Sequence, residues 1–187
     1  TAPYNNGSRN LTFDFSNNFF VGAMNGTNAP VWNSSGIYGG AYSFDGDNDG
    51  IIVADNISLR MSSQVTLSAW FSPNNLSSDS RGIVIKGEGG ITFEYGMAQI
   101  GDEIGYMENS GILRTDSNVL NANQWNFVTL VADETTQLID IYVNGVKYGN
   151  STLVQEEGTH NSNFIIEGST RPVSIGYTIG RQFFNGS

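Results

Sequence analysis

Residues 65–72 read Val-Thr-Leu-Ser-Ala-Trp-Phe-Ser, and this stretch shows the most regular pattern in the chain. Apolar side chains occupy its odd-numbered positions, whereas the even-numbered positions carry Thr, Ser and Trp70. Because successive side chains of a β-strand point to opposite faces of a sheet, the alternation predicts a strand with one buried face. Pro73 interrupts the alternation, so we expect the strand to end there.

A second group of strands is predicted later in the chain. Trp125–Ala132 and Leu138–Val143 are predicted as two strands that are joined by the polar connection Asp133–Gln137. Asn144-Gly145 then predicts a tight hairpin, because both residues tolerate positive φ. The chain is expected to return from this hairpin as the paired strand Val146–Tyr148.

Other short apolar runs are separated by turn residues along most of the chain. They predict further strands at Leu11–Phe15, Ala41–Phe44, Ile51–Ala54, Gly82–Lys86, Ile91–Tyr95, Ile104–Met107, Ile112–Thr115, Phe164–Glu167 and Val173–Tyr177. No window shows helical periodicity, and short strands at a spacing of roughly ten residues are typical of β-sandwiches. The sequence therefore predicts an all-β fold, a two-sheet antiparallel sandwich or jelly roll.

Composition restricts the possible classes of protein. The length of 187 residues predicts one domain, and the absence of cysteine excludes disulfides and thiolate metal sites. Eight basic and 18 acidic residues give a net charge of −10, which repels phosphate backbones, so no nucleic-acid partner is expected. No apolar run approaches the length of a membrane span, so membrane insertion is not expected.

An oxygen-rich turn lies between two of the predicted strands. Residues 43–53 read Ser-Phe-Asp-Gly-Asp-Asn-Asp-Gly-Ile-Ile-Val. Glycine provides turn conformations that other residues avoid, and the side chains of Asp and Asn provide the hard oxygen ligands that calcium prefers. Two interpretations remain open, a calcium site that pins the two strands and a solvated hairpin turn without metal.

Acceptor sequences for N-glycosylation, Asn-x-Ser/Thr, are more frequent than the composition of the chain predicts. This excess and the start at Thr1 rather than Met favour a processed glycoprotein that is secreted or displayed at the cell surface. The alternative is that a polar, loop-rich composition produces such sequences by chance. The eight candidate acceptors are Asn6, Asn10, Asn25, Asn33, Asn56, Asn75, Asn150 and Asn185.

The order of the short motifs resembles that of laminin-G-like domains of the concanavalin A-like lectin/glucanase superfamily. The motifs are residues 39–46 with Asp49, Val65–Pro73, Ile83–Gly87, Asn123–Val128, Ile141–Gly145, and Ser174–Gly176 leading to Phe184–Ser187. The resemblance covers the chain from about Leu11 and implies one jelly-roll domain of two curved antiparallel sheets. It also implies frequent calcium binding at the rim of the sandwich and the binding of glycans or protein partners.

The resemblance also implies a calcium site and a final strand. The structural calcium of the family would be placed here at Asp14 and at the turn residues Asp45, Gly46, Asp47 and Asp49. In the family, a last strand with a further Asp ligand follows the region that ends here at Ser187. That strand is expected to have been removed, to lie in a separate chain, or to be absent. The sheet edge that its loss exposes could be paired by a neighbouring chain.

Catalysis is not expected. The glucanase branch of the superfamily uses paired carboxylates on one strand, but Leu138–Val143 carries only Asp140. Glu103 and Glu108 are five residues apart and would point to opposite faces of a strand. The adjacent pair Glu156-Glu157 and the single histidine, His160, are predicted in polar loops.

Trp70, Asp140 and Tyr142 are predicted on the polar faces of their strands and would line a concave, sugar-binding sheet if these strands are neighbours. The alternative is that Trp70, Trp125 and Tyr142 fill the core. Binding residues are also often carried by loops, which makes Trp32, Tyr38, Asp102, Tyr106 and Tyr148 further candidates.

We therefore expect a non-catalytic extracellular binding or adhesion domain that recognises a glycan or a surface protein and holds a structural calcium. The alternative is a structural subunit of a surface assembly or filament that is completed by strands from neighbouring chains.

Overall fold

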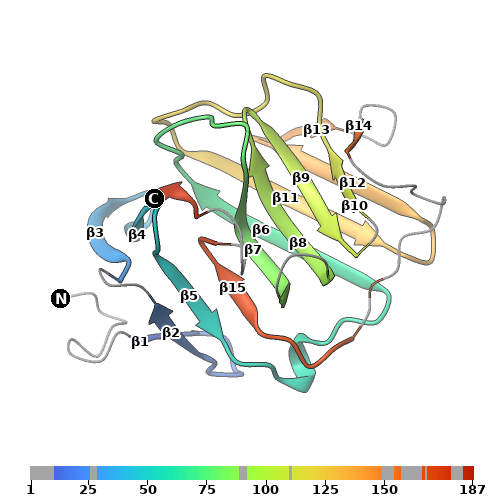
Figure 1. Ribbon diagram of the computed structural model, residues 1–187, viewed down its shortest axis with the longest axis horizontal. Coiled ribbons are helices and arrows are strands. Elements are labelled where there is room, and N and C mark those ends of the chain that lie inside the picture. The colour runs from blue at the N-terminus through green and yellow to red at the C-terminus, as the bar shows by residue number, and fades with distance from the viewer. Residues whose placement is uncertain are drawn as a thin grey trace.

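The computed structural model describes residues 11–25, 29–88, 92–109, 111–148, 154–156, 166, 168–177 and 183–187. These residues form sixteen β-strands and one short 3-10 helix (Figure 1). The elements are β1 Leu11–Phe13, β2 Val21–Asn25, β3 Val31–Gly36, β4 Gly39–Asp45, β5 Gly50–Val53, η1 Ile57–Leu59, β6 Gln64–Phe71, β7 Ser80–Glu88, β8 Thr92–Ile100, β9 Glu103–Glu108, β10 Gly111–Arg114, β11 Asn126–Asp133, β12 Leu138–Val143, β13 Val146–Tyr148, β14 Val154–Glu156, β15 Val173–Ile175 and β16 Asn185–Gly186.

The strands form a sandwich of two layers. One layer is a nine-stranded sheet with the order β1-β2-β5-β15-β7-β8-β9-β10-β14. The other layer contains a four-stranded sheet, β13-β12-β11-β6, and a three-stranded sheet, β16-β4-β3. Every pair of neighbouring strands is antiparallel, and β7, β8 and β9 overlie β6, β11 and β12 in Figure 1. The predicted all-β fold, a two-layer antiparallel sandwich, is confirmed.

The main core lies between the two layers. On β11 and β12 the residues that face it alternate with outward-facing residues, so that Val128, Leu130 and Ile141 are fully buried. They belong to the same apolar cluster as Met97 and Tyr106, which come from the nine-stranded sheet. A second, smaller cluster contains Ile85, Phe93, Ala98 and Met107. The pattern of alternate residues that predicted the strands therefore also describes how they pack.

The predicted strands agree with the structure where their pattern is strong. Leu138–Val143 and Val146–Tyr148 occur as predicted, and Asn144 and Gly145 have the positive φ angles, 51° and 84°, of the expected hairpin. The strands β2, β3, β14 and β16 were not predicted, because they are short or rich in Gly, Ser and Asn. The strand predicted at Phe164–Glu167 lies outside the described residues, except for Ile166, which is not in a strand.

The short strand β16 joins the two sheets of the second layer. Gly186 pairs with Phe44 of β4 on one side and with Pro73, just after β6, on the other. The C-terminal end of the chain consequently lies beside β4 in Figure 1. Within the described part of the chain, no helix is long and apolar enough to span a membrane.

Candidate functional site

The outward face of the four-stranded sheet brings together the three residues that were predicted to bind ligand. Side chains of β6, β11 and β12 alternate between the core and solvent, and Trp70, Asp140 and Tyr142 are all on the solvent side. The strands β6 and β12 are not direct neighbours, because β11 lies between them. Phe127 and Thr129 of β11 therefore complete the surface between Trp70 and Tyr142.

Three aromatic side chains form a platform at one end of this face. The rings of Trp70 and Phe127 are stacked, with centroids 5.0 Å apart and planes 30° from parallel. Tyr38, at the tip of the β3–β4 hairpin, contacts Trp70 edge-on with centroids 6.3 Å apart. Trp70 is 39% exposed and Tyr38 is 83% exposed. An apolar surface that large side chains leave open to solvent in this way is available to a ligand.

Polar groups continue from the platform across the sheet. The register places Thr129 opposite both Ser68 and Tyr142, and the hydroxyls of Ser68 and Thr129 are hydrogen-bonded at 3.1 Å. Lys147 donates to Asp140 Oδ2 at 2.8 Å, and its Nζ lies 5.8 Å from the centre of the Tyr142 ring. The hydrogen bond to Asp140 raises the pKa of Lys147. The face thus offers donors and acceptors beside an aromatic surface, a combination that ligand sites commonly use.

Sequence reasoning missed several members of this face, among them Lys147 and Phe127. Lys147 had a usable signal, because a two-residue Asn-Gly hairpin places it opposite Tyr142. Phe127 had none, because its position beside Trp70 depends on the pairing of β6 with β11, whose paired residues are far apart in sequence. The other aromatic candidates differ among themselves: Trp125 and Tyr148 are half-buried, whereas Tyr106 is fully buried in β9 rather than placed in a loop.

The acidic turn between β4 and β5 contains both exposed and buried carboxylates. Asp45 Oδ1 accepts hydrogen bonds from the backbone N–H groups of Asp47 and Asn48, at 2.8 Å and 3.3 Å. Asp49 is only 2% exposed, and its Oδ2 accepts from the Asp45 N–H at 3.0 Å. Its Oδ1 is buried and has no hydrogen-bond partner among the described residues. Burial, with the nearby charges of Asp45 and Asp47, raises the pKa of Asp49.

Asp14 does not join this turn. The register pairs Gly22 with Val53 and Asn25 with Gly50, while Phe13 pairs with Val21. Asp14 consequently lies near the end of β5, and the acidic turn precedes the start of the same strand. The Asp14 carboxylate accepts hydrogen bonds from Ser16 and from the backbone N–H of Phe20, which close the β1–β2 turn.

A calcium ion needs six to eight oxygen ligands at about 2.3–2.6 Å. Among the described residues, no three or more Asp, Glu, His or Cys side chains converge in a way that could hold a metal. The turn provides one buried, unpaired carboxylate oxygen at Asp49, while Asp45 already accepts two hydrogen bonds. The side chains present therefore fit a calcium ion in part, with Asp49 as the available ligand.

Where the structure describes their side chains, the carboxylates considered for catalysis do not form a pair. Glu103 forms an ion pair with Arg114, with Oε2 and Nη1 2.9 Å apart, and Glu108 is 3% exposed at the other end of β9. Asp140 is the only carboxylate on β12 and is held by Lys147. His160 and Glu157 lie outside the described residues, and of Glu156 only the backbone is described.

The candidate glycosylation sites differ in accessibility. Asn33, Asn56 and Asn75 are exposed in surface segments. Asn185 is half-buried, and its side-chain amide donates to the backbone oxygen of Asp45 at 3.0 Å. The remaining four are not described as side chains: Asn25 is described only as backbone in β2, and Asn6, Asn10 and Asn150 lie outside the described residues.

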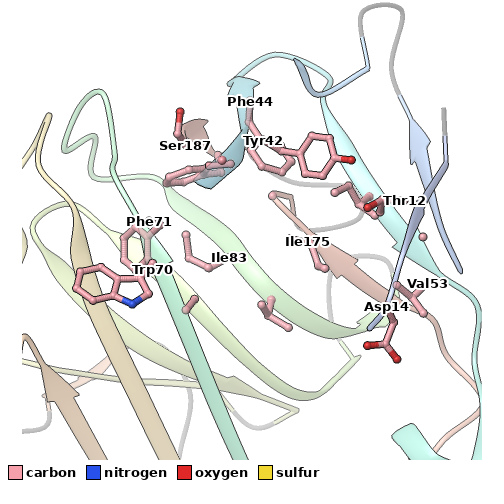
Figure 2. Close-up of a pocket in the computed structure, with 18 of the residues that line it drawn as sticks. Thr12, Asp14, Tyr42, Phe44, Val53, Trp70, Phe71, Ile83, Ile175 and Ser187 are labelled. Carbon is pink, nitrogen blue, oxygen red and sulfur yellow. The ribbon is translucent and has the colours of Figure 1, made fainter. Parts of the chain in front are cut away.

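A cavity of about 520 Å³ lies between the layers, behind Trp70. Its walls are mostly apolar, and Figure 2 shows Trp70 and Phe71 on one side of it and Tyr42 on the other. Ile175 of β15 contributes to its floor. Among the remaining loop candidates, Trp32 packs edge-on against Tyr42 with ring centroids 5.3 Å apart, and Asp102 is half-buried.

Several solved structures have a similar fold. Domain 4 of AbnA, a GH43 extracellular arabinanase from Geobacillus stearothermophilus solved with arabinotriose, has a TM-score of 0.65 and 19% identity, covering 92% of this chain and 81% of that one. The CBM40 of the Ruminococcus gnavus IT-sialidase, bound to alpha2,3 sialyllactose, has a TM-score of 0.54 and 15% identity. The match covers 78% of this chain and 83% of that one.

The binding domain of botulinum neurotoxin DC, in complex with rat synaptotagmin II, has a TM-score of 0.60 and 14% identity. The match covers 94% of this chain and 44% of the toxin chain, so the protein spans less than half of that relative. Each of these neighbours is one domain of a larger protein, and at such identities their likeness establishes the fold alone.

Sequence comparison gives a more specific result. No match was found among curated proteins. The Laminin_G_3 family model, described as concanavalin A-like lectin/glucanases superfamily, matches residues 45–187. Since this match covers well over half of the residues, the chain belongs to the laminin G-like family of the concanavalin A-like lectin/glucanases superfamily.

Proposed function

We propose that this protein is a non-catalytic binding domain that recognises a glycan on the outward face of its four-stranded sheet. The observation that carries the proposal is the exposed platform of Trp70, Phe127 and Tyr38 beside the polar groups of Asp140, Tyr142 and Lys147. The arabinanase domain and the sialidase CBM40, solved with arabinotriose and sialyllactose, support it by showing that similar folds bind sugars.

The apolar face of a sugar ring would stack on Trp70, and its hydroxyls would exchange hydrogen bonds with the polar groups. Trp70 and Asp140 lie two strands apart and four residues out of register. At about 4.8 Å per strand and 3.4 Å per residue, the diagonal between them is about 17 Å. Such a span suits an oligosaccharide better than a single sugar.

The charges of the face favour an uncharged glycan. Lys147 is the one basic residue on the described part of this face, and Asp140 already neutralises it. The chain carries a net charge of −10, which would repel acidic sugars at long range. We therefore favour neutral oligosaccharides, such as those related to arabinotriose, over sialylated ones.

The test is a glycan array followed by calorimetry on the best neutral oligosaccharide. Trp70→Ala is expected to weaken binding about tenfold or more, because it removes the stacking surface. Leu138→Ala is the matched control, since Leu138 is an exposed apolar residue at the far end of the same face. Equal affinities of the two variants would reject this site, and an array without any binding would reject the function.

We also propose that the domain is extracellular and glycosylated. Three candidate acceptors, Asn33, Asn56 and Asn75, are exposed and accessible to a transferase. Intact-mass measurement of native material, before and after enzymatic removal of N-glycans, tests this proposal. A mass equal to that of the bare polypeptide would contradict it.

A structural calcium at the β4–β5 turn is proposed on the strength of the buried, unpaired Asp49 Oδ1. A bound calcium would provide electrostatic stabilisation of the turn. Chelation is then expected to lower the melting temperature of the wild type but not of Asp49→Asn. Asp45→Ala would also be destabilising without calcium, because Asp45 closes the turn through two backbone hydrogen bonds. Identical melting curves of the wild type with calcium and with chelator would exclude the ion.

A second candidate function is a subunit of a surface assembly that neighbouring chains complete by adding strands. The observation that favours it is that, among the described residues, only the short strand β16 pairs between β4 and the end of β6. The other proposals do not depend on it.

A further inference from the structure

Tyr38 stands at one end of the outward face of the four-stranded sheet. It is the second residue of the two-residue turn between β3 and β4, and its side chain is 83% exposed. Its ring meets the ring of Trp70 at 76°, with the two centroids 6.3 Å apart. At this separation an edge-on pair of rings is in van der Waals contact, so no sugar ring fits between them.

The strand order places Tyr38 and the polar groups of the face on opposite sides of Trp70. Within the described residues β6 is an edge strand of its sheet, and β11, β12 and β13 follow on one side of it. Phe127 and Tyr142 lie on that side. The hairpin that carries Tyr38 belongs to the three-stranded sheet, which meets β6 from the other side through β16. An aromatic side chain therefore bounds the face at its β6 end.

The opposite end of the face is built differently. Within the described residues β13 is the last strand of the sheet there, and Lys147 is the residue that it places opposite Tyr142. The side chain of Lys147 is bonded to Asp140 on the neighbouring strand β12. It consequently reaches back across the sheet, and a ligand that lies on the face can continue past it to the sheet edge.

The β3–β4 hairpin is packed so as to hold Tyr38 in place. The pairing of its strands shifts between Asn33 and Gly36, an irregularity of the kind that bends a hairpin and redirects its side chains. A Cβ at Gly40 would lie 2.3 Å from the ring of Trp32, and a Cβ at Gly36 would lie 2.5 Å from the carbonyl carbon of Gly40. Glycine thus permits close contacts beneath the turn, and a side chain that is positioned in advance costs less to order when a ligand binds.

We propose that Tyr38 makes this face a site for the ends of glycan chains. The terminal sugar of a neutral chain rests on Trp70 against Tyr38, and the rest of the chain runs over β11 and β12 toward β13. A sugar inside a chain has neighbours on both sides, and at Trp70 one of these neighbours would collide with Tyr38. A terminal sugar lacks that neighbour. The inference rests on the proposed glycan binding and specifies its ligand class, chain ends rather than chain interiors.

The ring orientations distinguish this role from that of a third stacking surface. A chain that crossed the whole face would need aromatic rings that present their faces in similar directions to successive sugars. Phe127 meets this requirement, because its plane is 30° from that of Trp70. Tyr38 does not, because its ring stands at 76° to Trp70. Its geometry is that of a wall at the end of the platform.

The test counts the binding sites on a linear neutral polysaccharide that has been cut to short and to long chains. The probe is linear arabinan, or the polymer of whichever neutral series binds best on the glycan array. A protein that binds chain ends saturates per chain, so its saturating amount per gram of sugar falls in inverse proportion to chain length. We expect this dependence for the wild type, measured as calorimetric stoichiometry.

Two substitutions at Tyr38 decide whether its ring is the cause. Tyr38→Ala removes the wall, so this variant is expected to bind along the chain, with a saturating amount per gram that does not depend on chain length. The side chain is largely exposed, so its loss removes little packing and the variant should melt close to the wild type. Tyr38→Phe keeps the ring and should bind chain ends only. Ile37→Ala is the matched control, since Ile37 is an exposed apolar residue of the same turn.

The possible failures are distinguishable. A wild type whose saturating amount per gram is the same for short and long chains would overturn the proposal and leave glycan binding in place. A Tyr38→Ala variant that still binds only chain ends would also overturn it, because the wall would then lie elsewhere. Absence of binding to any neutral chain would reject the glycan function itself, and the proposal with it.

Discussion

Ser187 donates its backbone N–H to the carbonyl oxygen of Ser72 at 3.0 Å and accepts the N–H of Ser72 at 2.5 Å. This reciprocal pair fastens β16 to the end of β6, while Gly186 pairs with Phe44 of β4. A few residues at the end of the chain thus hold the two sheets of one layer together. Substitutions at this junction are therefore expected to lower the stability of the sandwich.

Gly186→Ala is expected to destabilise the domain by about 2–3 kcal/mol. An added Cβ would lie 2.1 Å from the backbone oxygen of Ser72, and the φ of Gly186 is 151°. Since the obstacle is backbone, β16 would have to move away from β6. Gly101→Ala is the control, because Gly101 also has positive φ, 62°, but has open space around its Cβ position. Urea unfolding that shows the same loss for both variants would mean that the contact with Ser72 has no effect.

Asp55→Asn is expected to destabilise the fold, because it removes the charge of a carboxylate that pairs with a buried cation. Lys86 is fully buried and donates to Asp55 Oδ1 at 2.9 Å and to the backbone oxygen of Arg171. Arg60 also donates to Asp55, at 3.0 Å through Nε. Urea unfolding at neutral pH measures the loss, and exposed Asp116→Asn serves as the control. A loss no larger than that of the control would contradict a role for the Asp55–Lys86 pair.

The same network predicts an acid-sensitive stability. Hydrogen bonds from Arg60 and Lys86 lower the pKa of Asp55 from 3.8 to about 2. A carboxyl with a lowered folded-state pKa stabilises the fold above its unfolded pKa, and this contribution disappears as the pH falls from about 4 to 2. The wild type should therefore lose its advantage over Asp55→Asn across this window. If the difference in unfolding free energy between the wild type and Asp55→Asn is the same at both ends of this pH window, the predicted pH dependence is wrong.

The sequence predicted the outward face better than the acidic site, for a physical reason. The shared face of Asp140 and Tyr142 follows from alternation within one strand, and that of Trp70 follows in the same way. The separation of Asp14 from Asp45, by contrast, depends on β2, a short strand with Gly22 as its second residue, which alternation did not reveal. Local periodicity fixes which face a residue takes, whereas long-range register fixes its neighbours.

Asp49→Asn tests the electrostatic strain of the acidic turn, with calcium removed by a chelator. The folded-state pKa of Asp49 is raised above 3.8, so the folded protein binds this proton more tightly than the unfolded chain does. Stability from this group is therefore present at low pH and declines as the pH rises from 3.8 through the raised pKa. Asn stays neutral, so the variant should overtake the wild type in melting temperature on going from about pH 3.5 to about pH 7. If the melting temperature of the wild type instead rises relative to that of the variant over that range, the prediction is wrong.

The last prediction concerns Asn144, which connects the hairpin turn to the aromatic platform. Its N–H donates to the backbone oxygen of Phe127 at 2.8 Å, and its Oδ1 accepts the N–H of Phe127 at 2.8 Å. Asn144→Gly keeps the positive φ but loses the side-chain bond, so it should cost about 1 kcal/mol of stability and weaken glycan binding by loosening Phe127 under Trp70. Asn144→Asp keeps the acceptor oxygen and should remain close to the wild type in both measurements. If the Gly variant binds as tightly as the Asp variant while being less stable, then Asn144 serves the hairpin alone, and the position of Phe127 does not depend on it.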